Sequence, residues 1–190
     1  MRKLLPPAIL ALSLSACVSL GPKVPESLFT LTADHPAAAG TAASGSYSSA
    51  IVVLEPEAEQ RLAVTRVPVQ IDDANVAYLK KAMWVERPAR LFQRLVAETI
   101  RAKGSRLVVE NDPGSSGLRL SGRLLDMGYD ARSQSVVVRY DAVKEWGGGK
   151  VEVRRFESVV PGVDDKAGAV GPALNQAANE VARQVAEWVG

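Results

Sequence analysis

Three consecutive stretches of alternating apolar and polar residues place the strongest constraint on how this chain can fold. They cover residues 118–129, 135–144 and 150–160, and turn residues separate them. Alternation with a period of two is typical of strands that are buried on one face. The first stretch changes phase between Leu124 and Leu125, which predicts a β-bulge. We therefore predict an antiparallel meander of three strands.

Two amphipathic segments provide helices to cover this sheet. Residues 88–103 begin with Pro88, precede a glycine and place apolar side chains at helical spacing. Residues 165–189 carry an apolar, alanine-rich stripe, and Pro172 predicts a kinked or separate first turn. Further strands are predicted over residues 51–54, 62–71, 76–85 and 106–110. The predicted fold is α+β, with a mostly antiparallel or mixed sheet and two long helices packed on one face.

The start of the chain has the features of an export signal. Two basic residues precede an apolar run over residues 4–14, which is about half the roughly 20 residues needed to cross a bilayer as a helix. The run ends in Leu-Ser-Ala-Cys at residues 14–17, which resembles a bacterial lipobox. The alternatives are an ordinary signal peptide followed by a chance cysteine and a free buried thiol. We predict a lipoprotein signal peptide over residues 1–16 and lipidation of Cys17.

The segment after Cys17 is predicted to be a tether. Residues 18–50 are rich in Ala, Ser, Gly and Pro. As a flexible coil they would reach roughly 30 Å on average and about 110 Å when stretched. Residues 28–31 are β-type and predict a short strand docked on the domain, with residues 32–50 as a loose excursion. The chain is thus divided into a lipidated N-terminus and tether over residues 17–50 and an α+β domain over residues 51–190.

The reactive side chains argue against most enzyme classes. Cys17 is the single cysteine, and the single histidine, His35, lies in the predicted tether, where no packing holds an imidazole for catalysis. No zinc-binding motif is present. The 23 basic residues include Arg2 and Lys3 of the signal, so the remaining ones balance the 21 acidic residues and give no support for nucleic-acid binding. We predict a protein that is not an enzyme and has no metal or cofactor beyond the covalent lipid on Cys17.

Four large apolar residues are the candidate partner- or lipid-binding residues. Tyr78, Leu79, Met83 and Trp84 share one predicted strand with two lysines. Such side chains can anchor an edge strand in the core, which is the commoner arrangement. They can also line an apolar surface for a lipid tail or a partner protein.

The order of these features resembles the ABC-type transport auxiliary lipoprotein family, which includes the PqiC-type subunits of MCE (mammalian cell entry) lipid transport systems. The resemblance rests on the lipobox, residues 28–31, residues 76–79, Trp84 before the first helix, residues 149–151 leading to Arg155-Phe156 and Val160-Pro161, and the terminal helix that ends in Trp188. This family brings no invariant catalytic residues, so we predict none.

The resemblance implies a non-enzymatic accessory subunit of an ABC/MCE-type transporter that moves lipids between the inner and outer membranes. Its expected partners are an MCE-domain protein with an ABC permease and ATPase, the membrane through the lipid anchor, and a phospholipid ligand, but no nucleic acid. Val18, where inner-membrane retention would need Asp, favours the periplasmic face of the outer membrane over the inner membrane. The alternatives are a lipid- or lipopolysaccharide-handling envelope lipoprotein and a structural envelope tether.

Overall fold

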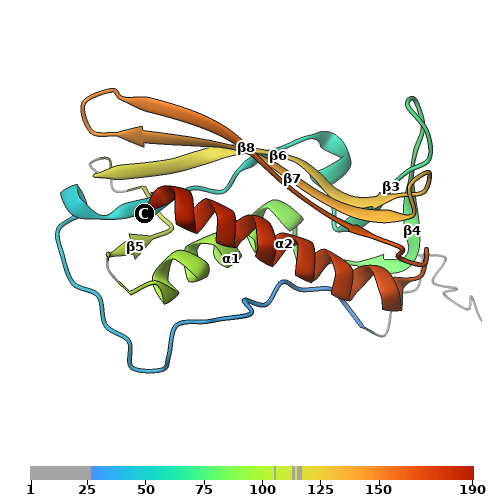
Figure 1. Ribbon diagram of the computed structural model, residues 1–190, viewed down its shortest axis with the longest axis horizontal. Coiled ribbons are helices and arrows are strands. Elements are labelled where there is room, and N and C mark those ends of the chain that lie inside the picture. Colours follow the sequence, from blue (N-terminus) through green and yellow to red (C-terminus); the bar gives the residue numbers. More distant parts are fainter. Residues whose placement is uncertain (1–26, 105, 113, 115–116) are drawn as a thin grey trace, which may run out of the picture.

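One mixed β-sheet forms a layer of the molecule, and two helices cover a single face of it (Figure 1). The computed structural model describes residues 27–104, 106–112, 114 and 117–190. The elements in chain order are β1 (Ile51–Val53), β2 (Glu57–Ala58), β3 (Arg66–Gln70), β4 (Val76–Met83), α1 (Pro88–Ala102), β5 (Val108–Val109), β6 (Leu118–Asp130), β7 (Ser135–Trp146), β8 (Val151–Pro161) and α2 (Ala167–Val189). This arrangement confirms the α+β prediction.

Strand β6 is the centre of the sheet. On one side it pairs antiparallel with β7, and β7 pairs antiparallel with β8, as the alternation over residues 118–160 predicted. On its other side β6 pairs in parallel with β1, β2 and β3, one after another along its length. Strand β5 extends the sheet beyond β1, and β4 extends it beyond β3. The long meander therefore ends in β8, while the other side of the sheet is built from short strands.

The predicted irregularity in β6 is present. The register between β6 and β7 shifts between Leu124 and Asp126, which confirms the bulge. Nearby, Gly122 has a φ of 152°, and a Cβ there would lie 2.1 Å from the carbonyl oxygen of Asp141. Only glycine permits this close approach between the strands.

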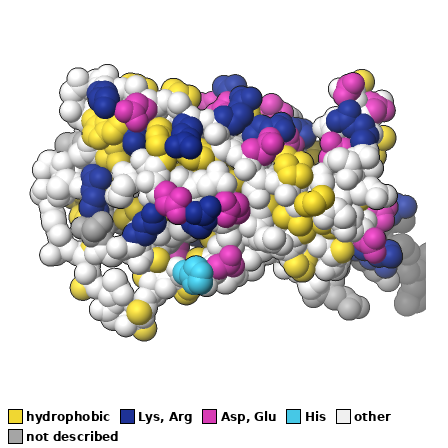
Figure 2. Space-filling view, in the orientation of Figure 1, with side chains coloured by type: hydrophobic (Ala, Val, Ile, Leu, Met, Phe, Trp, Pro, Cys, Tyr) yellow, Lys and Arg dark blue, Asp and Glu magenta, His cyan; other side chains and the backbone are white. Residues whose placement is uncertain are grey.

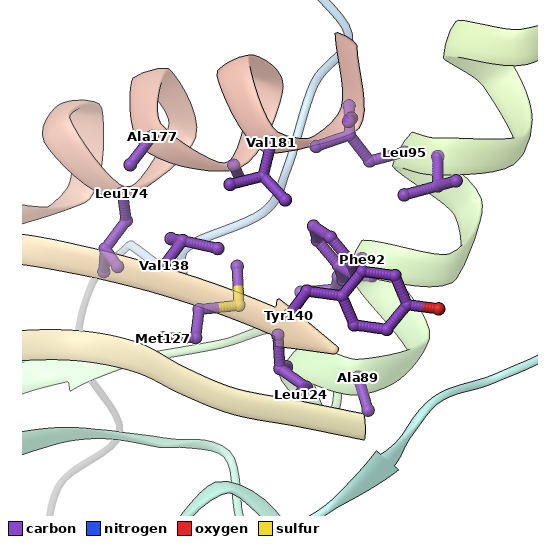
Figure 3. Close-up of a cluster of buried hydrophobic side chains, with 14 of the residues drawn as sticks. Ala89, Phe92, Leu95, Leu124, Met127, Val138, Tyr140, Leu174, Ala177 and Val181 are labelled. Carbon is purple, nitrogen blue, oxygen red and sulfur yellow. The ribbon is translucent and has the colours of Figure 1, made fainter. Parts of the chain in front are cut away.

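The core lies between the sheet and the two helices (Figure 3). Phe92 of α1 meets Tyr140 of β7 edge to face, with ring centroids 5.2 Å apart. The Tyr140 hydroxyl donates a hydrogen bond to the Ser121 carbonyl oxygen at 2.7 Å, and burial raises the pKa of this phenol. The alanine-rich face of α2 is buried along its length, and the helix runs from Ala167 to Val189 as one element that contains Pro172. The expected separate first turn is therefore absent from α2.

Residues 28–37 cross the outside of the helical layer, and we call them the N-terminal strap (Figure 1). The strap begins with a β-bridge between Phe29 and Trp84. The Phe29 N–H donates to the Met83 carbonyl oxygen at 2.7 Å, and the Val85 N–H donates to the Phe29 carbonyl oxygen at 2.8 Å. The Phe29 ring lies edge to face with Trp84 at 5.7 Å. The chain is thus attached to the domain from its first described residues.

Polar side chains of both helices hold the rest of the strap. The Asn175 side-chain oxygen accepts from the Thr32 N–H at 2.8 Å, and that of Asn179 accepts from the Asp34 N–H at 2.9 Å. Glu98 of α1 accepts from the Ala37 N–H at 2.8 Å. Residues 32–37, the first third of the segment that we predicted to be a flexible loop, are therefore held by hydrogen bonds, although their composition is that of a coil.

Candidate interaction surfaces

The four candidate binding residues of β4 and its end divide between the core and the surface. Trp84 is 1% exposed and Leu79 is also buried, so both contribute to the core. Among the described residues, the buried Trp84 indole N–H has no hydrogen-bond acceptor. Tyr78 and Met83 are half-buried and stay accessible. The role of all four in binding remains a prediction. Trp84 also packs against the Phe29 ring and forms a β-bridge with Phe29.

Strands β3 and β4 form a hairpin that projects from the body of the domain (Figure 1). Ile71 and Val76, which flank its turn, are exposed, and the Arg66 guanidinium lies 4.2 Å from the centre of the Tyr78 ring. We call Ile71, Val76 and Tyr78 the hairpin surface; by the register Val76 and Tyr78 share one face of the hairpin, and Ile71 lies on the other. The sequence analysis singled out Tyr78 but missed Ile71 and Val76. The signal for them was an apolar residue on each side of a polar four-residue turn.

Asp72 shapes the turn of this hairpin. One carboxylate oxygen accepts hydrogen bonds from the Ala74 N–H and the Asn75 N–H, each at 2.9 Å. The Asn75 side chain also donates to both carboxylate oxygens, and this hydrogen bonding holds the pKa of Asp72 below its usual value. Asp72 therefore closes the turn between Ile71 and Val76 with hydrogen bonds to Ala74 and Asn75.

The outer face of the sheet, opposite the helices, carries two rows of charges that alternate in sign across the strands; we call them the charge ladder. In one row Asp126 lies 2.9 Å from Arg61 and 3.1 Å from Arg139, which also pairs with Glu157. The other row runs from Arg123 through Asp141 to Arg155. Asp141 and Arg155 are 2.6 Å apart, and this hydrogen bond lowers the pKa of Asp141. Every neighbour within a row has the opposite charge.

A buried lysine joins the end of α2 to the sheet. Lys144 of β7 lies between the rings of Trp146 and Trp188, 4.7 Å and 4.3 Å from their centres. Its ammonium donates to the Trp188 carbonyl oxygen at 2.9 Å and lies 3.3 Å from a Glu152 oxygen. Because the lysine itself occupies the space between the rings, this aromatic pair is a structural contact.

Three hollows in the described part of the chain are open to solvent. One of about 340 Å³ is lined by His35, Glu180 and Arg183 together with the end of β8. Two others, of about 350 and 280 Å³, lie at the β7–β8 turn and beside Arg132. Within the described residues no group of three or more His, Cys, Asp or Glu side chains could hold a metal ion. The structure thus places His35 in the lining of an open hollow beside β8 and α2.

A family model decides where this chain belongs. The model of the ABC-type transport auxiliary lipoprotein component matches residues 29–186, which is most of the chain and runs from the strap to the last turns of α2. The chain belongs to the ABC-type transport auxiliary lipoprotein family. No curated protein matches the chain.

Two solved structures share the fold of this auxiliary lipoprotein. Protein XCC0632 from Xanthomonas campestris, of the family DUF330, is 16% identical with a TM-score of 0.72, and the match covers 85% of this chain and 93% of that one. An uncharacterized protein is 13% identical with a TM-score of 0.66, and the match covers 86% of this chain and all of the other. At these identities the likeness establishes the fold alone.

Membership of this family makes the protein a lipoprotein that is auxiliary to ABC-type transport and anchored to a membrane of the cell envelope. Cys17, the predicted lipid attachment site, lies outside the described residues, so its lipidation remains a prediction. No helix in the part that the structure describes is long and apolar enough to cross a membrane.

Proposed function

We propose that this protein is a non-enzymatic accessory subunit of an ABC/MCE-type transporter that moves lipids between the inner and outer membranes. The family match over residues 29–186 carries this proposal, because it supports an auxiliary role in ABC transport. In this proposal the lipid on Cys17 attaches the domain to the periplasmic face of the outer membrane. An MCE-domain protein, a permease and an ATPase complete the system.

The architecture supports docking to a protein in preference to enclosing a lipid. Side chains from both helices and the sheet fill the space between the two layers (Figure 3). The three hollows described above are open and have polar or charged residues in their linings. The hairpin surface, in contrast, presents apolar side chains on a projecting arm, which is typical of a protein contact. We propose this surface, with Tyr78 at its base and Met83 beyond it, as the contact for the MCE-domain partner.

Charge on the visible face of the molecule fits a protein partner better than nucleic acid. Figure 2 shows basic and acidic side chains interspersed over this face, with no large area of one sign. Nucleic-acid binding relies on a concentrated basic surface.

Capture of the full-length lipoprotein from cell envelopes in mild detergent tests the proposal. We expect an MCE-domain protein, with its permease and ATPase, to be recovered with it. Ile71→Asp and Val76→Asp should reduce this recovery, since both change exposed side chains of the hairpin surface. Val85→Asp is the matched control, because Val85 is 52% exposed, compared with 43% for Ile71 and 42% for Val76, and lies outside the hairpin.

Repeated capture without any MCE-domain protein would contradict the proposal. Phospholipid bound in a fixed ratio to the purified protein would instead support a lipid-handling role. Lipid transport that continues after deletion of the gene, with a disturbed assembly of the remaining components, would support a structural tether.

A further inference from the structure

Strand β8 leaves one side of its backbone without a strand neighbour. Among the described strands it pairs only with β7. At the turn the Trp146 N–H donates to the Lys150 carbonyl oxygen at 2.9 Å, which makes these two residues a hydrogen-bonded pair. Since such pairs alternate with non-bonded ones along an antiparallel ladder, the even-numbered residues of β8 bond to β7. The odd-numbered residues therefore direct their N–H and C=O groups away from β7.

The side chains of these odd-numbered residues share the outer face of the sheet, and several are apolar. Val151, Val153 and Val159 are 52%, 68% and 48% exposed. Exposed edges are usually protected by lysines, prolines or bulges. Strand β4 has such protection, with Lys80, a positive φ at Lys81 and an irregular register. Strand β8 keeps a regular register along its whole length and has proline only as its last residue, so its edge can accept another strand.

The outward side chains of β8 have a self-complementary order. Two apolar residues stand at each end of the series, and one basic and one acidic residue stand at its centre. In order the six residues are Val151, Val153, Arg155, Glu157, Val159 and Pro161. In an antiparallel pair of two β8 strands centred on Phe156, Arg155 lies opposite the partner's Glu157, and Val153 lies opposite the partner's Val159. We propose that β8 pairs in this register with β8 of a second copy of this chain.

The charges select this register over its neighbours. A centre at Arg155 places two arginines opposite each other, and a centre at Glu157 places two glutamates opposite each other. Like charges that are directly opposite in a sheet are destabilising. The backbone agrees with the Phe156 centre, because odd-numbered residues face odd-numbered residues and both have outward N–H and C=O groups. Pro161 lacks an N–H, and one Pro161 falls at each end of the symmetric ladder, so one hydrogen bond is lost at each end.

Pairing in this register also extends the charge ladder. The row of Arg123, Asp141 and Arg155 continues into the partner's Glu157, the partner's Arg139 and the partner's Asp126. The signs alternate without interruption over these six residues. By two-fold symmetry the same continuation occurs a second time. Strand β8 lies at one edge of the sheet, and the hairpin of β3 and β4 lies on the other side of β6. The inference does not depend on the transporter assignment.

A register-specific cross-link tests the pairing. Val153→Cys and Val159→Cys are made separately in the full-length lipoprotein, with tags of different size, and are oxidised in mild detergent alone and as a mixture. Directly opposite residues have Cα atoms about 5.5 Å apart, which suits a disulfide. In either variant alone the two cysteines lie about 20 Å apart along the strands.

We therefore expect a cross-linked dimer from the mixture but not from either variant alone, and none from the unsubstituted protein. No cross-link in the mixture, or equal cross-linking in a single variant, would overturn the proposed pairing. Cross-links that form only to a different protein would show that β8 serves a heterologous partner, which also overturns it.

A charge exchange gives an independent readout that does not use cysteines. Arg155→Glu alone places two glutamates opposite each other, and Glu157→Arg alone places two arginines opposite each other. A mixture of the two variants restores opposite charges across the pair. Sedimentation in detergent should show a dimer for the unsubstituted protein and the mixture, and a weaker dimer for each variant. Arg90→Glu, which changes an exposed arginine on α1, should leave the dimer unchanged. A monomer at every concentration of the unsubstituted protein, or undiminished dimers in both variants, would contradict the inference.

Discussion

The Phe29 ring rests on Gly171, so closely that a Cβ on Gly171 would lie 2.9 Å from the ring. This contact connects the start of the strap to α2, more than a hundred residues later in the chain. The absence of a side chain at Gly171 is what lets the aromatic ring reach the helix backbone. The strap therefore depends on a glycine that the helix itself does not require.

We expect Gly171→Ala to loosen the strap without unfolding the domain. The added methyl group displaces the Phe29 ring, while alanine favours the helix by about 0.5–1 kcal/mol. Hydrogen exchange should become faster at the Phe29 and Val85 amides, which form the bridge at the base of the strap. Gly168→Ala is the matched control, since a Cβ there meets nothing within 4 Å. Equal protection in both variants would show that the ring contact does not hold the strap.

Asn179 is expected to contribute more to stability than a typical polar residue of a helix. It is buried, and its side chain donates to the Thr32 carbonyl oxygen at 2.8 Å and accepts from the Asp34 N–H at 2.9 Å. Asn179→Ala removes both strap contacts and should lower the free energy of unfolding by about 2 kcal/mol. Denaturant titration measures this change. Gln176→Ala, an exposed change on the same helix, should have little effect.

Lys144 and Lys150 allow a direct comparison of a buried and an exposed lysine. Both bind Glu152 and lie 4.7 Å from the centre of the Trp146 ring. The side chain of Lys144 is 8% exposed, whereas that of Lys150 is 69% exposed. Lys144→Ala should lower the free energy of unfolding by about 1–3 kcal/mol, because it leaves a cavity and an unpaired carbonyl oxygen. Lys150→Ala should change it by less than about 0.5 kcal/mol. Similar losses in thermal or denaturant unfolding would refute this distinction.

The ion pair between Asp141 and Arg155 predicts a dependence on pH. Hydrogen bonds from Arg155 lower the pKa of Asp141 below its ordinary value of 3.8. A lowered pKa means that the folded state binds the proton less readily than the unfolded state. The stabilisation is therefore complete above pH 3.8 and is lost as the pH falls through the folded-state pKa.

Arg155→Gln should raise the pKa of Asp141 towards its ordinary value, which a carboxyl NMR titration measures. Arg154→Gln is the control, because Arg154 is the adjacent residue and stacks on the Phe156 ring at 5.0 Å. A pKa that is unchanged in Arg155→Gln would show that other charges determine it.

Sequence alone predicted the parts of the fold that depend on local periodicity. The meander, its bulge at Leu124 and both helices follow from the spacing of apolar residues. The strand predicted over residues 62–71 is shorter, because it is preceded by a 3₁₀ turn at Gln60–Leu62 and covers only Arg66–Gln70. The parallel pairing of three short strands with β6 had no local signal, since each pair joins distant parts of the chain.

The surfaces were harder to predict than the fold. The sequence left open whether Trp84 is core or surface, because a large apolar residue before a helix suits both. The structure packs the Phe29 ring against Trp84, and these two residues are more than fifty positions apart in the chain. Docking was predicted for residues 28–31, but the course of residues 32–37 over the helices was missed for the same reason. Their hydrogen bonds come from Asn175 and Asn179, at the other end of the chain.

Docking of the strap limits how far the domain can stand from its membrane. With the lipid that we propose on Cys17, eleven peptide bonds connect the anchor to Leu28. Even fully extended, they span at most about 40 Å. A protein held this closely remains beside the lipid surface that carries it. Any transporter component fixed in the opposite membrane therefore has to cover the remaining distance with its own structure.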